Sequence, residues 1–141
     1  PCRSTAFTPT KFYLIMSNIL LIEDEPWLGE LYAQLLSAEH RVAWLRDGYD
    51  AMAHIDRQRP DIIVLDILLP WASGVQLLHE LVGYDDTARI PVILFSAALP
   101  DDLNSEILRA YGVVTALDKT AVKPAQVLKT INGVLKVHAN L

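Results

Sequence analysis

The sequence predicts an α/β protein built on a doubly wound sheet of five parallel strands. From residue 18 onward, short apolar runs alternate five times with segments of helical period, which is typical of repeated strand–helix units. The third and fourth runs are almost unbroken Val, Ile and Leu, as expected for strands covered on both faces. Two runs, 19–22 and 62–65, end directly in acidic residues, which places carboxylates at the carboxyl ends of two strands.

The strands are predicted from the apolar runs, each of which is about five residues long. A helix should follow each strand, as a repeating strand–helix pattern requires. In chain order, we expect the strands at residues 18–23, 41–45, 61–66, 90–95 and 113–117.

Each segment after a strand carries apolar residues at helical spacing, so that one stripe can face the sheet. The first helix begins after Asp24, with Pro26 suited to its first turn. The second is expected near 47–57 and the fourth near 101–111. The five stripes are Leu28, Leu31, Tyr32, Leu35 and Leu36; Ala51, Met52 and Ile55; Gly74, Leu77, Leu78 and Leu81; Leu103, Ile107 and Tyr111; and Val127, Leu128, Ile131, Val134 and Leu135.

Residues 1–15 differ in character from the rest, and we divide the chain into a leader at 1–15 and one domain at 16–141. The leader contains several Ser, Thr and Pro residues, and Met16 resembles a natural start just before the first strand. A cloning scar or upstream translated sequence explains such a leader, and the alternative is that 12–15 packs on a neighbouring surface or extends the first strand. The lone cysteine, Cys2, cannot form an internal disulfide, so we expect a cytoplasmic location.

Composition excludes several classes of protein. The chain has 141 residues, of which 52% are hydrophobic, enough for one globular domain with a real core. Its net charge is −5, and its 12 Lys and Arg residues form no basic cluster, so we expect no direct nucleic-acid contact by this segment. Polar residues interrupt every apolar run well before the roughly 18 residues of a membrane span.

The most informative residue is Asp66, which closes the third apolar run. Glu23 and Asp24 close the first run, and the carboxyl ends of parallel strands lie at one edge of a sheet, so these acids should share a pocket. Carboxylates brought close together repel one another, and a hard divalent cation relieves that repulsion. The sequence therefore predicts a Mg²⁺ site at this edge.

Two further polar residues should reach the same edge. Ser96 ends the fourth strand and can donate a hydrogen bond to a phosphoryl oxygen, and Lys119 follows the fifth strand and can pair with the carboxylates. Asp66, on the central strand, is best placed to act as a nucleophile toward a phosphoryl group. Together Asp66, Ser96 and Lys119 predict a phosphoacceptor site.

Four segments in register resemble the receiver domains of two-component response regulators. They are 22–26, 60–70 with Gly74 after it, 91–97 and 111–119, and the resemblance covers residues 18 to about 138. It implies a flavodoxin-like (βα)5 fold with strand order 2-1-3-4-5. It also implies a signalling switch rather than an enzyme, with only self-phosphotransfer and autodephosphorylation as reactions.

The resemblance assigns a role to each site residue. Asp66 would accept a phosphoryl group from a sensor histidine kinase or a phosphotransfer protein. Asp24, Asp66 and the backbone carbonyl of Leu68 would be Mg²⁺ ligands, with Glu23 acting through water, while Ser96 would be the switch hydroxyl. Lys119 would be the site lysine. The partner downstream would be a protein target or an output domain outside this sequence, and homodimer formation stays open.

The chain departs from the family pattern at two positions. Thr120 follows the lysine where relatives usually carry Pro, and Lys123 before Pro124 is a competing candidate; spacing from Gly112 favours Lys119, with a trans peptide after it. Ala116 stands where many receivers hold an aromatic switch residue. The alternative function is therefore a receiver-like interaction module that acts without phosphorylation.

Other candidates are assigned plainer roles. A flavin-binding protein would be disfavoured by the acids after the first strand, and an aspartate-dependent phosphatase usually needs a second acid where Leu68 stands. Because neither Leu68 nor Ala98 can orient an attacking water, we expect slow self-dephosphorylation. Trp27, Trp44 and Trp71 are interpreted as packing or edge residues. The four histidines, His40, His54, His79 and His138, lack metal-ligand spacing and are expected at the surface.

Overall fold

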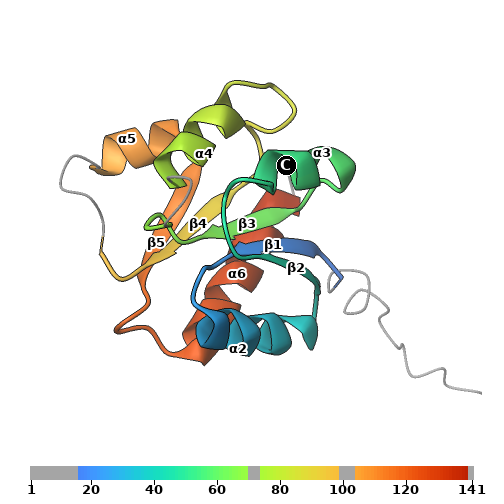
Figure 1. The fold of residues 1–141 in the computed structure, drawn as a ribbon, viewed down its shortest axis with the longest axis vertical. Coiled ribbons are helices and arrows are strands. Elements are labelled where there is room, and N and C mark those ends of the chain that lie inside the picture. The colour runs from blue at the N-terminus through green and yellow to red at the C-terminus, as the bar shows by residue number, and fades with distance from the viewer. Residues whose placement is uncertain (1–15, 70–73, 99–103, 140–141) are drawn as a thin grey trace, which may run out of the picture.

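The computed structural model describes residues 16–69, 74–98 and 104–139, and this part of the chain alternates strands with helices throughout (Figure 1). The strands are β1 (Asn18–Ile22), β2 (Arg41–Leu45), β3 (Ile62–Leu65), β4 (Val92–Ser96) and β5 (Val113–Asp118). The helices are α2 (Pro26–Ser37), α3 (Ala51–Arg57), α4 (Gly74–Val82), α5 (Ser105–Ala110) and α6 (Pro124–Ala139).

The five strands form one parallel sheet in the order β2-β1-β3-β4-β5. This confirms the predicted fold class and strand order. The register pairs Ile22 of β1 with Leu65 of β3. The residues that follow these two, Glu23 and Asp66, therefore leave the sheet side by side.

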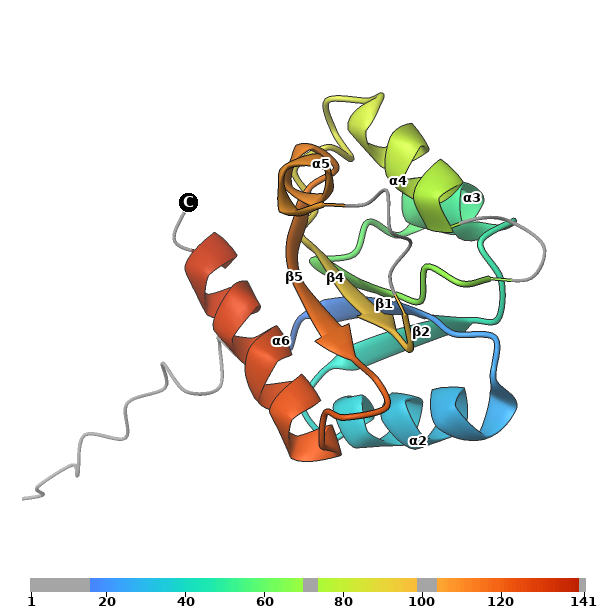
Figure 2. The same cartoon turned by 90° about the vertical axis from the view of Figure 1, so that its left-hand side faces the viewer.

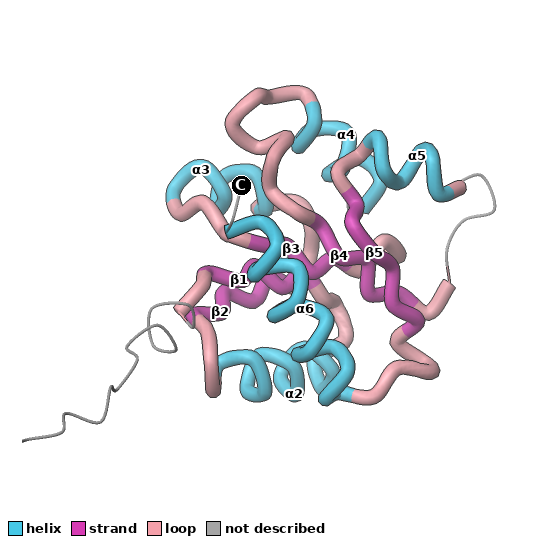
Figure 3. The backbone as a smooth tube through the Cα atoms, turned by 180° about the vertical axis from the view of Figure 1, so that it is seen from behind, coloured by secondary structure: helices cyan, strands magenta, loops and turns pink. Residues whose placement is uncertain are grey.

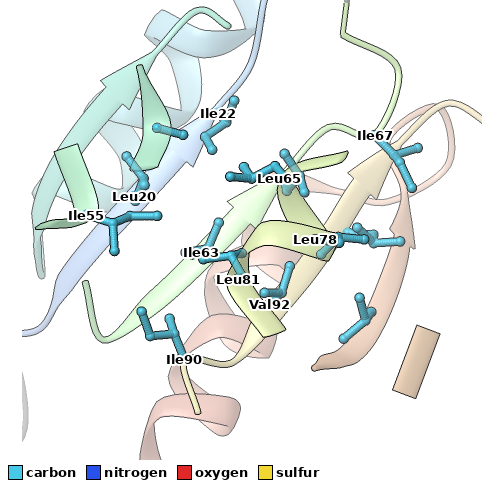
Figure 4. Close-up of a cluster of buried hydrophobic side chains, with 14 of the residues drawn as sticks. Leu20, Ile22, Ile55, Ile63, Leu65, Ile67, Leu78, Leu81, Ile90 and Val92 are labelled. Atoms are coloured by element: carbon cyan, nitrogen blue, oxygen red, sulfur yellow. The ribbon is translucent and has the colours of Figure 1, made fainter. Parts of the chain in front are cut away.

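The helices cover both faces of the sheet, so the protein has three layers. Helices α2 and α6 lie on one face and α3, α4 and α5 on the other, as Figures 2 and 3 show. Each face carries its own apolar cluster, because successive side chains of a strand point to opposite sides. On the α3–α4–α5 side, Ile63 and Leu65 pack against Leu78 and Leu81 (Figure 4). On the α2–α6 side, the cluster is centred on Phe95, whose ring meets Tyr32 edge-on at 4.8 Å.

Two helices begin later than the sequence predicts. Helix α3 begins at Ala51 rather than near 47, because Asp47 accepts a hydrogen bond from the Tyr49 amide and holds a turn there. Helix α5 begins at Ser105, where the Asn104 side chain caps it by accepting from the Ile107 amide. The start expected at 101, with Leu103, lies outside the described residues.

The apolar stripe predicted for that helix is confirmed at Tyr111, which is partly buried and packs against the core, and is wrong at Ile107, which is 37% exposed. The buried residue of the helix is Leu108, which was not predicted. The helix is short, so a one-residue difference in phase turns a different side chain toward the sheet.

The histidine prediction was wrong for His40, which is buried at the turn between α2 and β2. Its Nε2 lies 2.7 Å from Oδ1 of Asn132 on α6, and its Nδ1 accepts from the Ser17 amide. Because that amide needs an acceptor at Nδ1, the proton sits on Nε2 and donates to Asn132. His40 thus joins α6 to the start of the sheet.

Three other expectations can be compared with the structure. Trp27 is exposed and Trp44 packs against the α2–α6 cluster, while Trp71 and the leader at 1–15 lie outside the described residues. None of the described helices is long and apolar enough to cross a membrane. The peptide after Lys119 is trans, as predicted.

Core packing predicts a large and localised loss of stability. Leu78 is fully buried on α4, so Leu78→Ala should lower the free energy of unfolding by about 2–5 kcal/mol, since it leaves a cavity. Val137→Ala, at a 61% exposed position of α6, is the control and should change it by less than about 0.5 kcal/mol. Urea unfolding checks both, and equal losses would contradict this assignment of the core.

Candidate functional site

The carboxyl ends of four strands bring the predicted site residues to one edge of the sheet. Glu23 follows β1, Asp66 follows β3, Ser96 ends β4 and Lys119 follows β5. The Asp66 amide donates to the carbonyl of Ile22, which extends the β1–β3 pairing up to the acids. Glu23, Asp66 and Ser96 are each less than 4% exposed, although all three are polar. Buried polar groups of this kind need partners.

Asp66 is held at both oxygens of its carboxylate. Oδ1 accepts from the Ser96 hydroxyl and from the Leu68 amide, each at 2.9 Å. Oδ2 accepts from the ammonium of Lys119 at 2.6 Å. These bonds fix the orientation of the carboxylate. The contribution of the Leu68 amide was missed from the sequence, because backbone donors leave no trace in residue identity.

Lys119 joins two carboxylates. Its Nζ lies 2.8 Å from Oε1 and 3.3 Å from Oε2 of Glu23, in addition to its bond to Asp66. Its amide also donates to the Ser96 carbonyl, which anchors the lysine to the end of β4. Lys123, the competing candidate, is exposed just before α6. The structure therefore brings Lys119, and not Lys123, to the acids.

The loop that presents Lys119 has its own support in place of the family's proline. The carboxylate of Asp118 accepts from both the amide and the hydroxyl of Thr120, and these bonds lower the pKa of Asp118. The Asp118 carbonyl accepts from the amides of Ala121 and Val122. Sequence reasoning identified Thr120 only as a departure, although an Asp side chain often accepts from the backbone amide two residues further on.

The charges of the site do not balance. Burial raises the pKa of Glu23 to about 7, against an ordinary value of 4.5; Lys119 acts in the opposite direction, and the neighbouring Asp66 adds to the rise. Burial disfavours the charge of Lys119, but its bonds to Asp66 and Glu23 outweigh this and raise its pKa. One ammonium thus serves several carboxylates, and burial favours the protonated form of Glu23.

Asp24 completes a cluster with the chemistry of a hard-cation site. Oxygen atoms of Glu23, Asp24 and Asp66 lie within 4.8 Å of one another, and Asp24 is partly exposed, which leaves it free to face an ion from solvent. Mg²⁺ prefers such oxygen donors and retains several waters. The excess negative charge and the raised pKa of Glu23 fit a divalent cation. Leu68 lies next to this cluster, with its side chain 51% exposed.

Comparison with known proteins decides the family. A family model described as the response regulator receiver domain matches residues 19–132. The chain belongs to this family. As a receiver domain it has the sheet order already described, and its acidic cluster lies at the edge where the strands end.

Relatives of this receiver domain have different overall lengths. It is 34% identical over 112 residues to the transcriptional regulatory protein AfsQ1 of Streptomyces coelicolor, matching 79% of this chain but only 46% of AfsQ1. It is 30% identical over 124 residues to Protein PilH of Pseudomonas aeruginosa, matching 85% of this chain and 98% of PilH. The chain thus spans about half of one relative and nearly all of the other.

A solved structure of similar fold contains a metal. The receiver domain of the sensor histidine kinase PA1611 from Pseudomonas aeruginosa was crystallised with a magnesium ion coordinated in its active site cleft. It shares 27% identity and a TM-score of 0.71 with this receiver domain, covering 85% of this chain and 98% of that one.

The raised pKa of Glu23 predicts a pH effect on stability in the presence of a chelator. Because the folded pKa of about 7 exceeds the unfolded value, the folded state binds more protons between these values. The associated stability is present below pH 4.5 and is lost as pH rises through about 7. Urea unfolding in EDTA should show this loss in wild type relative to Glu23→Gln. A difference between the two proteins that stays constant from about pH 5 to 8 would contradict the assignment.

Proposed function

We propose that this receiver domain is a phosphorylation-controlled switch of a two-component system, in which Asp66 accepts a phosphoryl group from a histidine kinase or phosphotransfer protein. The observation that carries the proposal is the buried Asp66 carboxylate, oriented by Ser96, Leu68 and Lys119 within a cluster of acids. We also propose a cytoplasmic location, as expected from the sequence.

The proposed transfer is a displacement at phosphorus. A carboxylate oxygen of Asp66 attacks, an O–P bond forms, and the P–N bond of the donor phosphohistidine breaks; the imidazole keeps the electron pair and takes up a proton. Mg²⁺ would be held by Glu23, Asp24, Asp66 and the Leu68 carbonyl. When bound, it would neutralise negative charge on the phosphoryl group. Lys119 adds a second positive charge beside the acceptor. Apart from this transfer and the later hydrolysis of the acyl phosphate, which releases inorganic phosphate and regenerates the Asp66 carboxylate, no turnover is proposed.

The switch itself would be a shift between two conformations. The Ser96 hydroxyl lies within bonding distance of both Asp66 Oδ1 and the Ala98 carbonyl, at 2.9 and 3.1 Å. A phosphoryl oxygen would compete for that hydroxyl and for the ammonium of Lys119. About 1.4 kcal/mol of differential stabilisation changes the ratio of two states tenfold, so modest contacts suffice. In this proposal, the active conformation would act on a downstream protein target or on an output domain.

The alternative, an interaction module that acts without phosphorylation, was motivated by Thr120 and Ala116. Thr120 now has a structural account in its bonds to Asp118. Ala116 is exposed on β5. Because its side chain is a single methyl group, it cannot swing inward when Ser96 moves, as a large aromatic side chain could. The two functions differ in whether Asp66 is modified at all, which makes the covalent state the deciding measurement.

Intact mass after treatment with an acyl phosphate and Mg²⁺ tests the proposal. Wild type should gain the mass of one phosphoryl group, and Asp66→Asn should gain none, because an amide cannot attack phosphorus in this way. Asp56→Asn, at an exposed position of α3, is the matched control and should behave as wild type. An adduct that persists in Asp66→Asn would move the site elsewhere, and a lack of adduct in wild type would favour the alternative function.

The apolar residues beside the site predict a long-lived phosphoryl group. Leu68 and Ala98 are exposed next to Asp66 and Ser96, and neither side chain can orient a water for attack on the acyl phosphate. Leu68→Asn should therefore shorten the lifetime of the adduct, measured by mass after removal of the donor. Leu68→Ala, which removes bulk without adding a polar group, is the control and should leave it nearly unchanged. An identical lifetime in wild type and Leu68→Asn would overturn this explanation.

A further inference from the structure

Trp44 contacts the acidic turn from the edge strand β2. Its indole N–H donates to the backbone carbonyl of Glu23 at 2.9 Å. The side chain is partly buried and packs with the apolar cluster between the sheet and α2. In the strand register Trp44 pairs with Leu21, two residues before Glu23. The indole thus extends along the sheet to Glu23, the first residue after β1.

The bond from Trp44 fixes one particular peptide plane, the one between Glu23 and Asp24. The carbonyl of that peptide accepts from the indole, and its N–H, which belongs to Asp24, donates to Oε2 of Glu23 at 3.1 Å. The Glu23 amide donates to the Leu45 carbonyl at 3.0 Å. Rotation of the plane would break the indole bond and turn the Asp24 amide away from the Glu23 carboxylate. The orientation of both acids therefore depends on this plane.

Gly29 provides the space that the indole occupies. A Cβ at position 29 would overlap Cζ2 and Cε2 of Trp44, so no larger residue fits while the indole keeps its place. Gly29 lies inside α2, where glycine costs about 0.5–1 kcal/mol relative to alanine. This cost is offset at position 29 because the missing side chain leaves room for the Trp44 ring beside the acidic turn.

We infer that Trp44 is a positioning residue for the cation-binding acids, holding the Glu23–Asp24 peptide in the orientation that directs both carboxylates to the site, with Gly29 as the space that makes this contact feasible. The inference rests on the proposed function, because it concerns the affinity of the same site for a divalent cation. Trp44 touches no reacting atom. Its effect should appear in cation affinity rather than in the chemistry of Asp66.

The deciding variant is Trp44→Phe, which keeps an aromatic ring and removes the N–H donor. Loss of one neutral hydrogen bond corresponds to roughly three- to tenfold weaker Mn²⁺ binding, measured by calorimetry. The Mg²⁺ concentration for half-maximal phosphorylation should rise by a similar factor, while the rate at saturating Mg²⁺ should recover. Gly29→Ala, which displaces the indole, should shift Mn²⁺ affinity in the same direction. If that variant does not fold, Trp44→Phe still decides.

Two controls separate positioning from packing. Val42→Ala removes apolar contact from the same strand without touching Glu23, so it should lower stability in urea and leave Mn²⁺ affinity unchanged. Trp27→Phe alters the exposed tryptophan in the first turn of α2 and should change neither. Equal Mn²⁺ affinity in wild type and Trp44→Phe would reduce Trp44 to a packing residue. A wild type that binds no Mn²⁺ would instead refute the proposed metal site itself.

Discussion

The structure depends on an imbalance of charge at the edge where the strands end. Glu23 and Asp66 are buried there with one ammonium, that of Lys119, between them, and Asp24 stands beside them. At about 4 Å, two like charges near a protein surface repel by roughly 4 kcal/mol. The fold tolerates this because Lys119 bridges two of the acids and burial raises the pKa of Glu23, which favours its uncharged form. This surplus of negative charge supports the proposal that the site binds a divalent cation.

The order of the strands produces this imbalance. Strand β3 lies between β1 and β4, so Asp66 emerges with Glu23 on one side and Ser96 on the other. Lys119 comes from the far side of β4 and must reach past Ser96 to both acids. The long, flexible stem of lysine and its compact ammonium suit this reach better than the rigid fork of arginine. The anchoring bond from the Lys119 amide to the Ser96 carbonyl starts the stem at the right place.

Much of this arrangement could be predicted from the sequence, because apolar periodicity and strand-end acids are local patterns. The parallel sheet and the convergence of Asp66 with Glu23 required only those patterns and the handedness of crossovers, whereas the strand order was implied by the resemblance to receiver domains. The features that the sequence could not predict are contacts between residues that lie far apart along the chain. His40 is buried because Asn132 on α6 offers an acceptor, and Trp44 finds Glu23 because Gly29 leaves room. Residue types carry no record of such pairings.

The two departures from the family pattern have different consequences once the structure is considered. Thr120 is compensated, since Asp118 supports the loop that a proline would otherwise stiffen, and Lys119 still reaches Asp66. Ala116 has no such compensation among the bonds of the described residues, and it is exposed on β5. The Ser96 hydroxyl can donate to the Ala98 carbonyl as well as to Asp66. In the proposed switch, a movement of Ser96 would therefore change its bond to the Ala98 carbonyl and so affect the backbone after β4. In the proposed switch the phosphoacceptor site would not depend on position 116, because the bonds that orient Asp66 involve neither that residue nor an aromatic ring.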